Sequence, residues 1–143
     1  MIASRLLRTV VVALSTVALW APMTASPAVA AAGCHGNACD GRNPKSQGCQ
    51  GDARDVPKSR VHAGSAPYPE VWARYSPTCQ AVWAKADKAD GRSFRIDVLD
   101  GPSYVESTQS SFQAFSAMVG ADHTYRVCLR DVDGRWECGP WHR

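Results

Sequence analysis

The stretch that decides the fold reads Val127-Cys128-Leu129-Arg130-Asp131-Val132-Asp133-Gly134-Arg135-Trp136-Glu137-Cys138. Its Asp133-Gly134 step is typical of a β-hairpin turn, and the residues on both sides favour strands. We expect a three-residue loop over residues 132–134, with Gly134 in the left-handed conformation. This loop would pair Asp131 with Arg135 and set the register of the whole hairpin.

Counting outward from the loop predicts which side chains face each other. Arg130 faces Trp136, and Cys128 faces Cys138 at a pair without backbone hydrogen bonds, where antiparallel strands lie closest. The stretch therefore predicts a Cys128–Cys138 disulfide, with Trp136 on the same face of the hairpin as that bridge.

Four more cysteines, Cys34, Cys39, Cys49 and Cys79, precede the hairpin. An even number of cysteines in a short exported chain indicates a disulfide framework. Three pairings of these four are open, and in each of them Cys79 bonds to one of the three N-terminal cysteines. At least one bridge therefore joins the glycine-rich N-terminal segment to the turn at Cys79.

A zinc site is the competing interpretation of the N-terminal cysteines. Cys34, His35 and Cys39 lie close together, but Cys49 is ten residues further on, and zinc sites usually have two closely spaced pairs. Export also favours oxidised cysteines. We expect disulfides, with no metal and no cofactor.

Residues 1–30 have the three parts of a secretory signal peptide. Arg5 and Arg8 give a positive start, residues 10–21 form an uncharged apolar stretch, and Ala28-Val29-Ala30 is a cleavage site. The apolar stretch is short for a membrane span. We expect cleavage after Ala30, which leaves a secreted chain of 113 residues.

Lipid attachment and charge-driven partners are both disfavoured. Ala31-Ala32-Gly33-Cys34 resembles a lipid-attachment sequence, but Ala31 stands where a larger aliphatic residue is usual, so we do not expect a lipoprotein. Without Arg5 and Arg8 the chain has 14 basic and 13 acidic residues. This balance indicates neither nucleic-acid binding nor, after signal cleavage, membrane binding.

The remaining sequence predicts one domain in two parts. Residues 31–55 are rich in glycine and cysteine and are expected to form a stapled loop, followed by a β-rich core over 56–143. Residues 71–75 and 94–98 have strand patterns, whereas 80–86 and 112–119 fit either a strand or a short helix. The pattern predicts an all-β fold, a small antiparallel barrel or sandwich stapled by disulfides, with at most one short helix.

Two motifs resemble a known family. The first is Cys39-Asp40-Gly41-Arg42-Asn43-Pro44, with Gly48-Cys49 and Asp52-Ala53; the second is Arg74-Tyr75-Ser76-Pro77-Thr78-Cys79, with Ala81-Val82-Trp83-Ala84. Both are similar to the YjfA-like family of secreted, mostly actinobacterial proteins, a domain of unknown function. The resemblance covers roughly residues 34–100. It implies secretion and a β-rich, disulfide-bonded fold, and it brings no activity, cofactor or catalytic residue.

Catalytic motifs are not recognisable in the secreted part of the sequence. It has no Gly-x-Ser-x-Gly elbow, and its histidines lie in no known motif. These histidines are His35, His62, His123 and His142. We therefore expect no enzyme, with a hydrolase that uses a histidine-containing cleft as the least favoured alternative.

Tryptophans supply the candidate binding surface. Trp141 lies near the chain end and Trp136 lies beside the expected disulfide, and exposed tryptophans are frequent contact residues for sugars and proteins. We expect a monomeric, non-catalytic binding module for a cell-wall component or an extracellular protein. The alternative is a secreted peptidase inhibitor, with residues 107–116 as the inhibitory loop.

Overall fold

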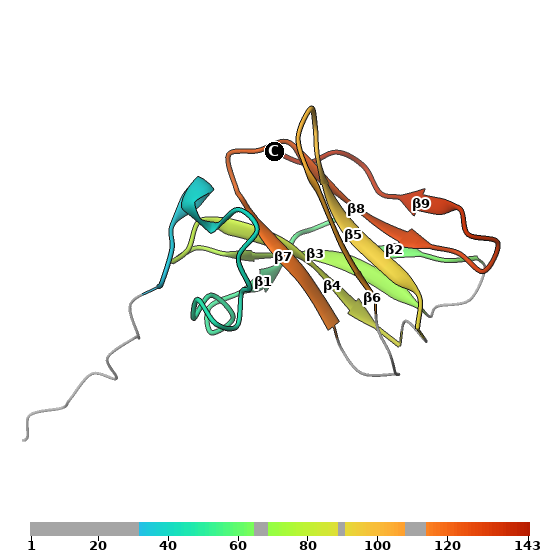
Figure 1. Cartoon of the computed structure of the whole chain (residues 1–143), viewed down its shortest axis with the longest axis horizontal. Coiled ribbons are helices and arrows are strands. Elements are labelled where there is room, and N and C mark those ends of the chain that lie inside the picture. Colours follow the sequence, from blue (N-terminus) through green and yellow to red (C-terminus); the bar gives the residue numbers. More distant parts are fainter. Residues whose placement is uncertain (1–31, 65–68, 89–90, 108–113) are drawn as a thin grey trace, which may run out of the picture.

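Two antiparallel sheets lie face to face in the computed structural model, which describes residues 32–64, 69–88, 91–107 and 114–143 (Figure 1). The first sheet contains β1 (Arg54–Asp55), β2 (Val61–His62), β3 (Glu70–Ser76), β4 (Ala81–Asp87) and β7 (Ala114–Gly120). The second contains β5 (Ser93–Val98), β6 (Ser103–Ser107), β8 (Tyr125–Arg130) and β9 (Trp136–Cys138). The other regular element in these ranges is a 3-10 turn, η1 (Gly36–Cys39).

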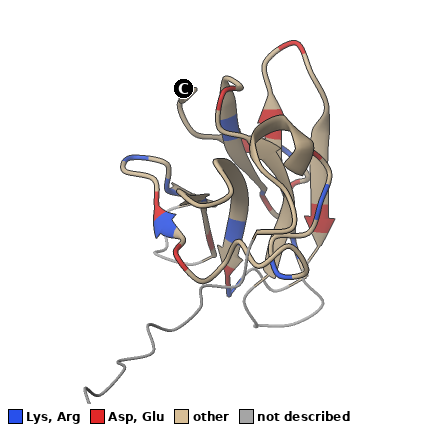
Figure 2. Cartoon of the chain, turned by 90° about the vertical axis from the view of Figure 1, so that its left-hand side faces the viewer, with Lys and Arg blue, Asp and Glu red and all other residues tan. Residues whose placement is uncertain are grey.

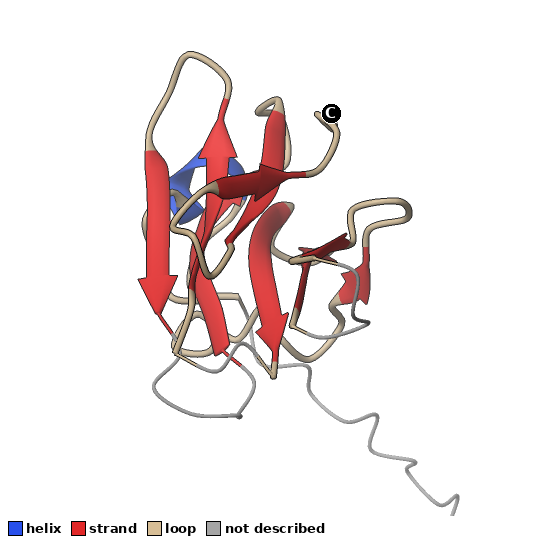
Figure 3. Ribbon diagram, turned by 90° about the vertical axis from the view of Figure 1, so that its right-hand side faces the viewer, coloured by secondary structure: helices blue, strands red, loops and turns tan. Residues whose placement is uncertain are grey.

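The strand order makes the fold a sandwich. The first sheet runs β1-β3-β4-β7, with β2 also on β3, and the second runs β6-β5-β8-β9. Figure 3 shows these strands in red and the 3-10 turn behind them in blue. The predicted all-β class is confirmed, and the short helix that the sequence allowed does not occur in the described ranges.

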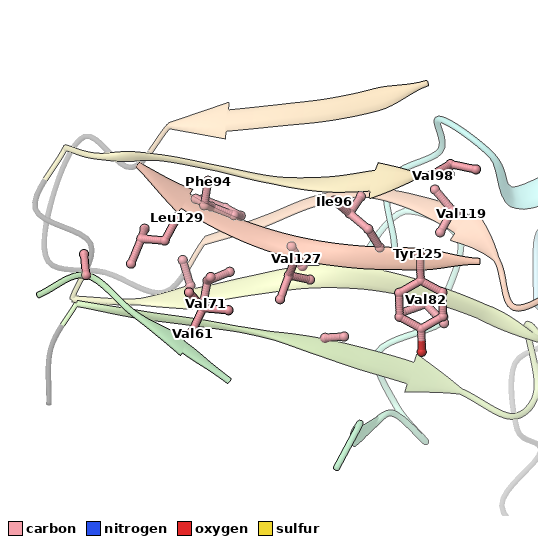
Figure 4. Packing of buried hydrophobic residues seen from close by; sticks show 14 residues of the cluster. Val61, Val71, Val82, Phe94, Ile96, Val98, Val119, Tyr125, Val127 and Leu129 are labelled. Atoms are coloured by element: carbon pink, nitrogen blue, oxygen red, sulfur yellow. The ribbon is translucent and has the colours of Figure 1, made fainter. Parts of the chain in front are cut away.

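Side chains at alternate strand positions fill the space between the sheets (Figure 4). β5 and β8 contribute the largest of them, and Phe94, Ile96 and Leu129 are fully buried. The first sheet supplies smaller partners, including Val71, Val82 and Val119. Burying an aliphatic or aromatic side chain of this kind stabilises the fold by about 1.5–3 kcal/mol. This core is therefore the main source of stability.

β4 resolves the choice between strand and helix for residues 80–86. It is a central strand that pairs with both β3 and β7, and this pairing overrides the helix propensity of its alanines. The register with β7 shifts between Trp83 and Lys85, which is a β-bulge. The Ala84 N–H at this point donates to Ser116 Oγ at 3.0 Å, so the bulge leaves no buried donor unpaired. Residues 114–119 likewise form a strand; 112 and 113 lie outside the described residues.

The C-terminal hairpin has the register expected from its turn. Arg130 pairs with Trp136, and Cys128 pairs with Cys138. The Asp131 N–H donates to the Arg135 carbonyl at 2.8 Å, and Gly134 has a φ of 82°. The Cys128–Cys138 disulfide is present, with its Cα atoms 4.0 Å apart. Local turn chemistry thus determined this part of the fold.

The N-terminal segment covers the outer face of the first sheet. Cys34 bonds to Cys39, and Cys49 bonds to Cys79, which lies in the turn between β3 and β4. The four cysteines form a second buried cluster with side chains of the outer face, namely Ala81, Trp83 and Met118. The segment at 31–55 is therefore a stapled loop as expected, although its last two residues form strand β1.

The expected export signal, residues 1–30, lies outside the described residues. Among the helices that the structure describes, none has the length and apolar character that a membrane crossing requires. All six cysteines are paired, and three disulfides are consistent with an extracellular protein.

Candidate functional site

The outer face of the second sheet gathers arginines and tryptophans around the Cys128–Cys138 disulfide. Alternation places Arg95 of β5 and Arg126 and Arg130 of β8 on this side, because Phe94, Ile96, Val127 and Leu129 point into the core. Trp136 of β9 and Trp141 beyond it complete the set. We call these five residues the arginine–tryptophan face; they are Arg95, Arg126, Arg130, Trp136 and Trp141.

Each tryptophan of this face is stacked by an arginine. The Arg95 guanidinium carbon lies 4.2 Å from the centre of the Trp136 ring, and that of Arg130 lies 6.0 Å from the same ring. The Arg126 guanidinium carbon lies 4.5 Å from the centre of the Trp141 ring. Contacts at these distances are cation–π interactions, and they hold the rings and the charges in fixed relative positions.

Asp97 organises the arginines from beneath. Its carboxylate pairs with Arg95 Nε at 2.8 Å and with Arg126 Nε at 3.1 Å, and it accepts a hydrogen bond from Ser103 Oγ at 2.7 Å. The Asp97 side chain is only 7% exposed. A ligand would therefore meet guanidinium groups and aromatic rings, while the single carboxylate between them is already occupied.

The arginine–tryptophan face is accessible to a partner. Trp141 is 41% exposed. Val105 of β6, which pairs with Arg95 of β5, is 52% exposed. The outer face of the first sheet differs, because the N-terminal segment lies on it. Basic and acidic residues are otherwise intermixed along the elements (Figure 2), so this concentration of cations is local.

The sequence singles out the two tryptophans of this face but not its charged residues. Trp136 and Trp141 were predicted as a binding surface, and the structure places both on one side of one sheet. Arg95, Arg126 and Asp97 were missed. The alternation of buried and exposed residues along β5 and β8 could have predicted them. It places their side chains on the same face of the sheet as Cys128.

The other two tryptophans of the described residues are structural. Trp83 is 2% exposed and belongs to the second buried cluster. Trp72 is 6% exposed, and its indole Nε1–H donates to Asp55 Oδ1 at 2.8 Å while Arg60 stacks on the ring at 4.4 Å. Both rings are therefore largely covered by the protein itself.

The histidines do not assemble a catalytic triad in the described part of the chain. His123 Nε2 lies 2.9 Å from Asp40 Oδ2, an arrangement that could orient a base. No described hydroxyl or thiol hydrogen-bonds to His123, however. Asp40 also accepts the Gly120 N–H at 2.7 Å, so the pair joins the N-terminal segment to the turn after β7. His35 and His62 are exposed, and His142 stacks on Tyr125.

The motif aspartate Asp52 has a similar structural role. Its carboxylate accepts hydrogen bonds from Ser76 Oγ at 2.6 Å and from the Thr78 N–H at 2.8 Å, which fixes the turn that carries Cys79. Burial tends to raise the pKa of Asp52, but these hydrogen bonds lower it by more, so the pKa lies below its ordinary value. Asp40 and Asp52, the two aspartates of the first motif, therefore both have a structural role.

The cysteine clusters are unsuitable as metal ligands in the oxidised protein. Cys34, Cys39 and Cys49 lie close together, as do Asp97, Cys128 and Cys138, but every one of these cysteines is in a disulfide. Metal binding needs the thiolate, which a disulfide does not offer. The loop expected for a peptidase inhibitor, 107–116, cannot be assessed over 108–113, which the structure does not describe.

The fold and its bridges define a class, a small all-β sandwich domain held by three disulfides. Within that class the chain belongs to the family described as "Protein of unknown function (DUF2690)", whose model matches residues 37–128. That range includes Asp40, Asp52 and most of both sheets. No curated protein and no solved structure matches the chain at a significant level.

Proposed function

We propose that this protein is a secreted, monomeric, non-catalytic binding module that contacts an anionic polymer of the cell envelope through the arginine–tryptophan face. One observation carries the proposal: an accessible sheet face presents three arginines stacked on two tryptophans, and the Asp97 carboxylate beneath them is already paired with two of these arginines. The resemblance to the YjfA-like family, and with it an actinobacterial source, is part of this proposal.

Positive charge and tryptophan ring surface both favour an anionic sugar polymer as the ligand. Arg95, Arg126 and Arg130 give the face an excess of positive charge over Asp97, which attracts phosphate or carboxylate groups. Trp141 and Trp136 offer ring surface on which the apolar face of a sugar can stack. Guanidinium groups also bind phosphate and carboxylate with two parallel hydrogen bonds, which suits repeating anionic units.

Co-sedimentation with purified cell-wall sacculi tests this proposal. We expect the secreted chain, 31–143, to bind at low salt and to retain part of its binding at high salt, because stacking is not screened as charge is. Trp141→Ala should weaken binding roughly tenfold or more, as is usual for a tryptophan at the centre of a contact. Arg130→Gln should weaken it mainly at low salt, since Arg130 is exposed and has no ion pair among the described residues.

The matched control is Arg54→Gln, which removes an exposed arginine from β1 of the other sheet. It should bind sacculi as the unaltered protein does. Sedimentation that is equally strong for Trp141→Ala and for the unaltered protein would exclude this face as the contact surface.

A further inference from the structure

We infer that a pocket between the two sheets, where β8 begins, is a binding site for a small molecule with an apolar body and one carboxylate. The pocket has a volume of about 550 Å³, within the range of roughly 300–1,000 Å³ typical of small-molecule sites. None of its lining residues belongs to the arginine–tryptophan face, so this inference is independent of the proposed function. The lining residues are Arg54, Asp55, Val56, Pro57, Tyr75, Val82, Ala121, Tyr125 and Arg143.

The interior of the pocket is apolar. Val56, Pro57, Val82 and Ala121 form its walls. Val82 is 1% exposed and is part of the main core, so the pocket reaches down to the packed interior of the sandwich. Val82 and Tyr125 both line the pocket and both belong to the core cluster drawn in Figure 4. An apolar ligand body would replace water at these walls, which is the usual driving force for binding in such a site.

Two phenol hydroxyls in the pocket lack a hydrogen-bond partner in the described part of the chain. Neither the Tyr75 nor the Tyr125 hydroxyl makes a hydrogen bond to another described residue. Tyr125 is nevertheless held firmly: its backbone N–H and carbonyl both pair with His142, at 2.9 and 2.8 Å, and the two rings stack with centres 5.8 Å apart. Burial, together with the nearby Tyr75, raises the pKa of Tyr125 to about 12, so its hydroxyl stays protonated and can donate.

The charged groups at the rim favour an anion. The Arg54 guanidinium carbon lies 5.5 Å from the centre of the Tyr75 ring, and Arg143 lies on the same rim. Arg54 has no ion pair among the described residues. Asp55, the one acidic side chain of the lining, is already engaged by Arg60 at 2.9 Å and by Arg74 at 3.3 Å.

The polar side chains of the pocket that make no hydrogen bond or ion pair to another described residue thus include the Arg54 guanidinium group and two phenol hydroxyls. All three can donate hydrogen bonds, and the guanidinium group carries positive charge. The complementary group is a small anionic acceptor, and a carboxylate matches the paired donors of a guanidinium. The apolar walls then select for a chain or ring attached to that carboxylate.

Isothermal titration calorimetry with octanoate and 1-octanol tests the inference, because the two probes share an apolar chain and differ in charge. We expect octanoate to bind roughly tenfold more tightly than 1-octanol, the usual difference for a charge-assisted hydrogen bond. Arg54→Gln should remove that difference and leave 1-octanol binding unchanged. Ala121→Trp, which fills the pocket, should abolish binding of both probes.

Arg130→Gln is the matched control, because it removes an exposed arginine at the opposite end of β8. It should bind octanoate as the unaltered protein does. The inference is overturned if neither probe binds, if 1-octanol binds as tightly as octanoate, or if Arg54→Gln binds octanoate normally. Arg54 is exposed, so its variant is expected to fold, and a thermal unfolding curve would verify this.

Discussion

Replacing both Cys49 and Cys79 with alanine is expected to lower the free energy of unfolding by about 3–4 kcal/mol. This is the free energy that corresponds to the chain entropy lost by the unfolded state when a loop of this length is closed. The bridge spans a sequence separation of 30 and joins the N-terminal segment to the turn after β3. Both residues are fully buried against Trp83 and Met118. Urea unfolding of the variant and the unaltered protein, followed by tryptophan fluorescence, would measure the difference.

The matched control is the alanine double variant of Cys34 and Cys39, whose bridge spans a separation of only 5. Chain entropy predicts a smaller loss there, about 2 kcal/mol. If the two double variants lost equal stability, the long-range bridge would not be the main covalent restraint on the N-terminal segment.

Asp97→Asn is expected to lower the free energy of unfolding by about 3 kcal/mol, since removing one partner of a buried ion pair leaves the other charges uncompensated. Two guanidinium groups, those of Arg95 and Arg126, lose their common negative charge, and one of the two oxygens that they contact becomes an amide donor. The arginines should then leave their positions over Trp136 and Trp141. Near-ultraviolet circular dichroism would record the change at the tryptophans, and urea unfolding would record the stability.

Glu106→Gln is the control for this variant. Glu106 lies exposed on β6, the strand beside β5, so the substitution removes one negative charge nearby without breaking a described contact. A surface change of this kind should alter stability by less than about 0.5 kcal/mol. If Asp97→Asn lowered the free energy of unfolding by less than about 1 kcal/mol, Asp97 would not be the buried charge that holds Arg95 and Arg126 in place.

Local sequence signals were sufficient where the structure itself is local. The Asp133-Gly134 turn and the period of two fixed the register of the C-terminal hairpin, because its outermost pair, Cys128 and Cys138, has a sequence separation of only 10. The same reasoning could not pair Cys34, Cys39, Cys49 and Cys79. Their connectivity depends on how the N-terminal segment lies on the outer face of the first sheet, a contact between residues far apart in sequence.

Residues 80–86 show the limit of propensity. Their alanines favour a helix in isolation, yet β4 is a central strand with neighbours on both edges. Small residues suit this position, because Ala81 packs against the N-terminal cysteines while Ala84 and Ala86 face the main core. The proposed binding surface follows from the sequence only in part for a related reason. The tryptophans stand out in the sequence, whereas the place of Arg126 over Trp141 depends on the fold.

Proton–nitrogen NMR of the tryptophan indoles tests most directly whether the arginine–tryptophan face binds an anionic envelope polymer. The secreted chain, 31–143, has four tryptophans, so its four indole signals report on both sheets. The signals would be followed while the anionic polymer released from purified sacculi is added. We predict that the indole signals of Trp136 and Trp141 shift while those of Trp72 and Trp83 do not. Shifts confined to Trp72 and Trp83, or no shift at any indole, would contradict the claim.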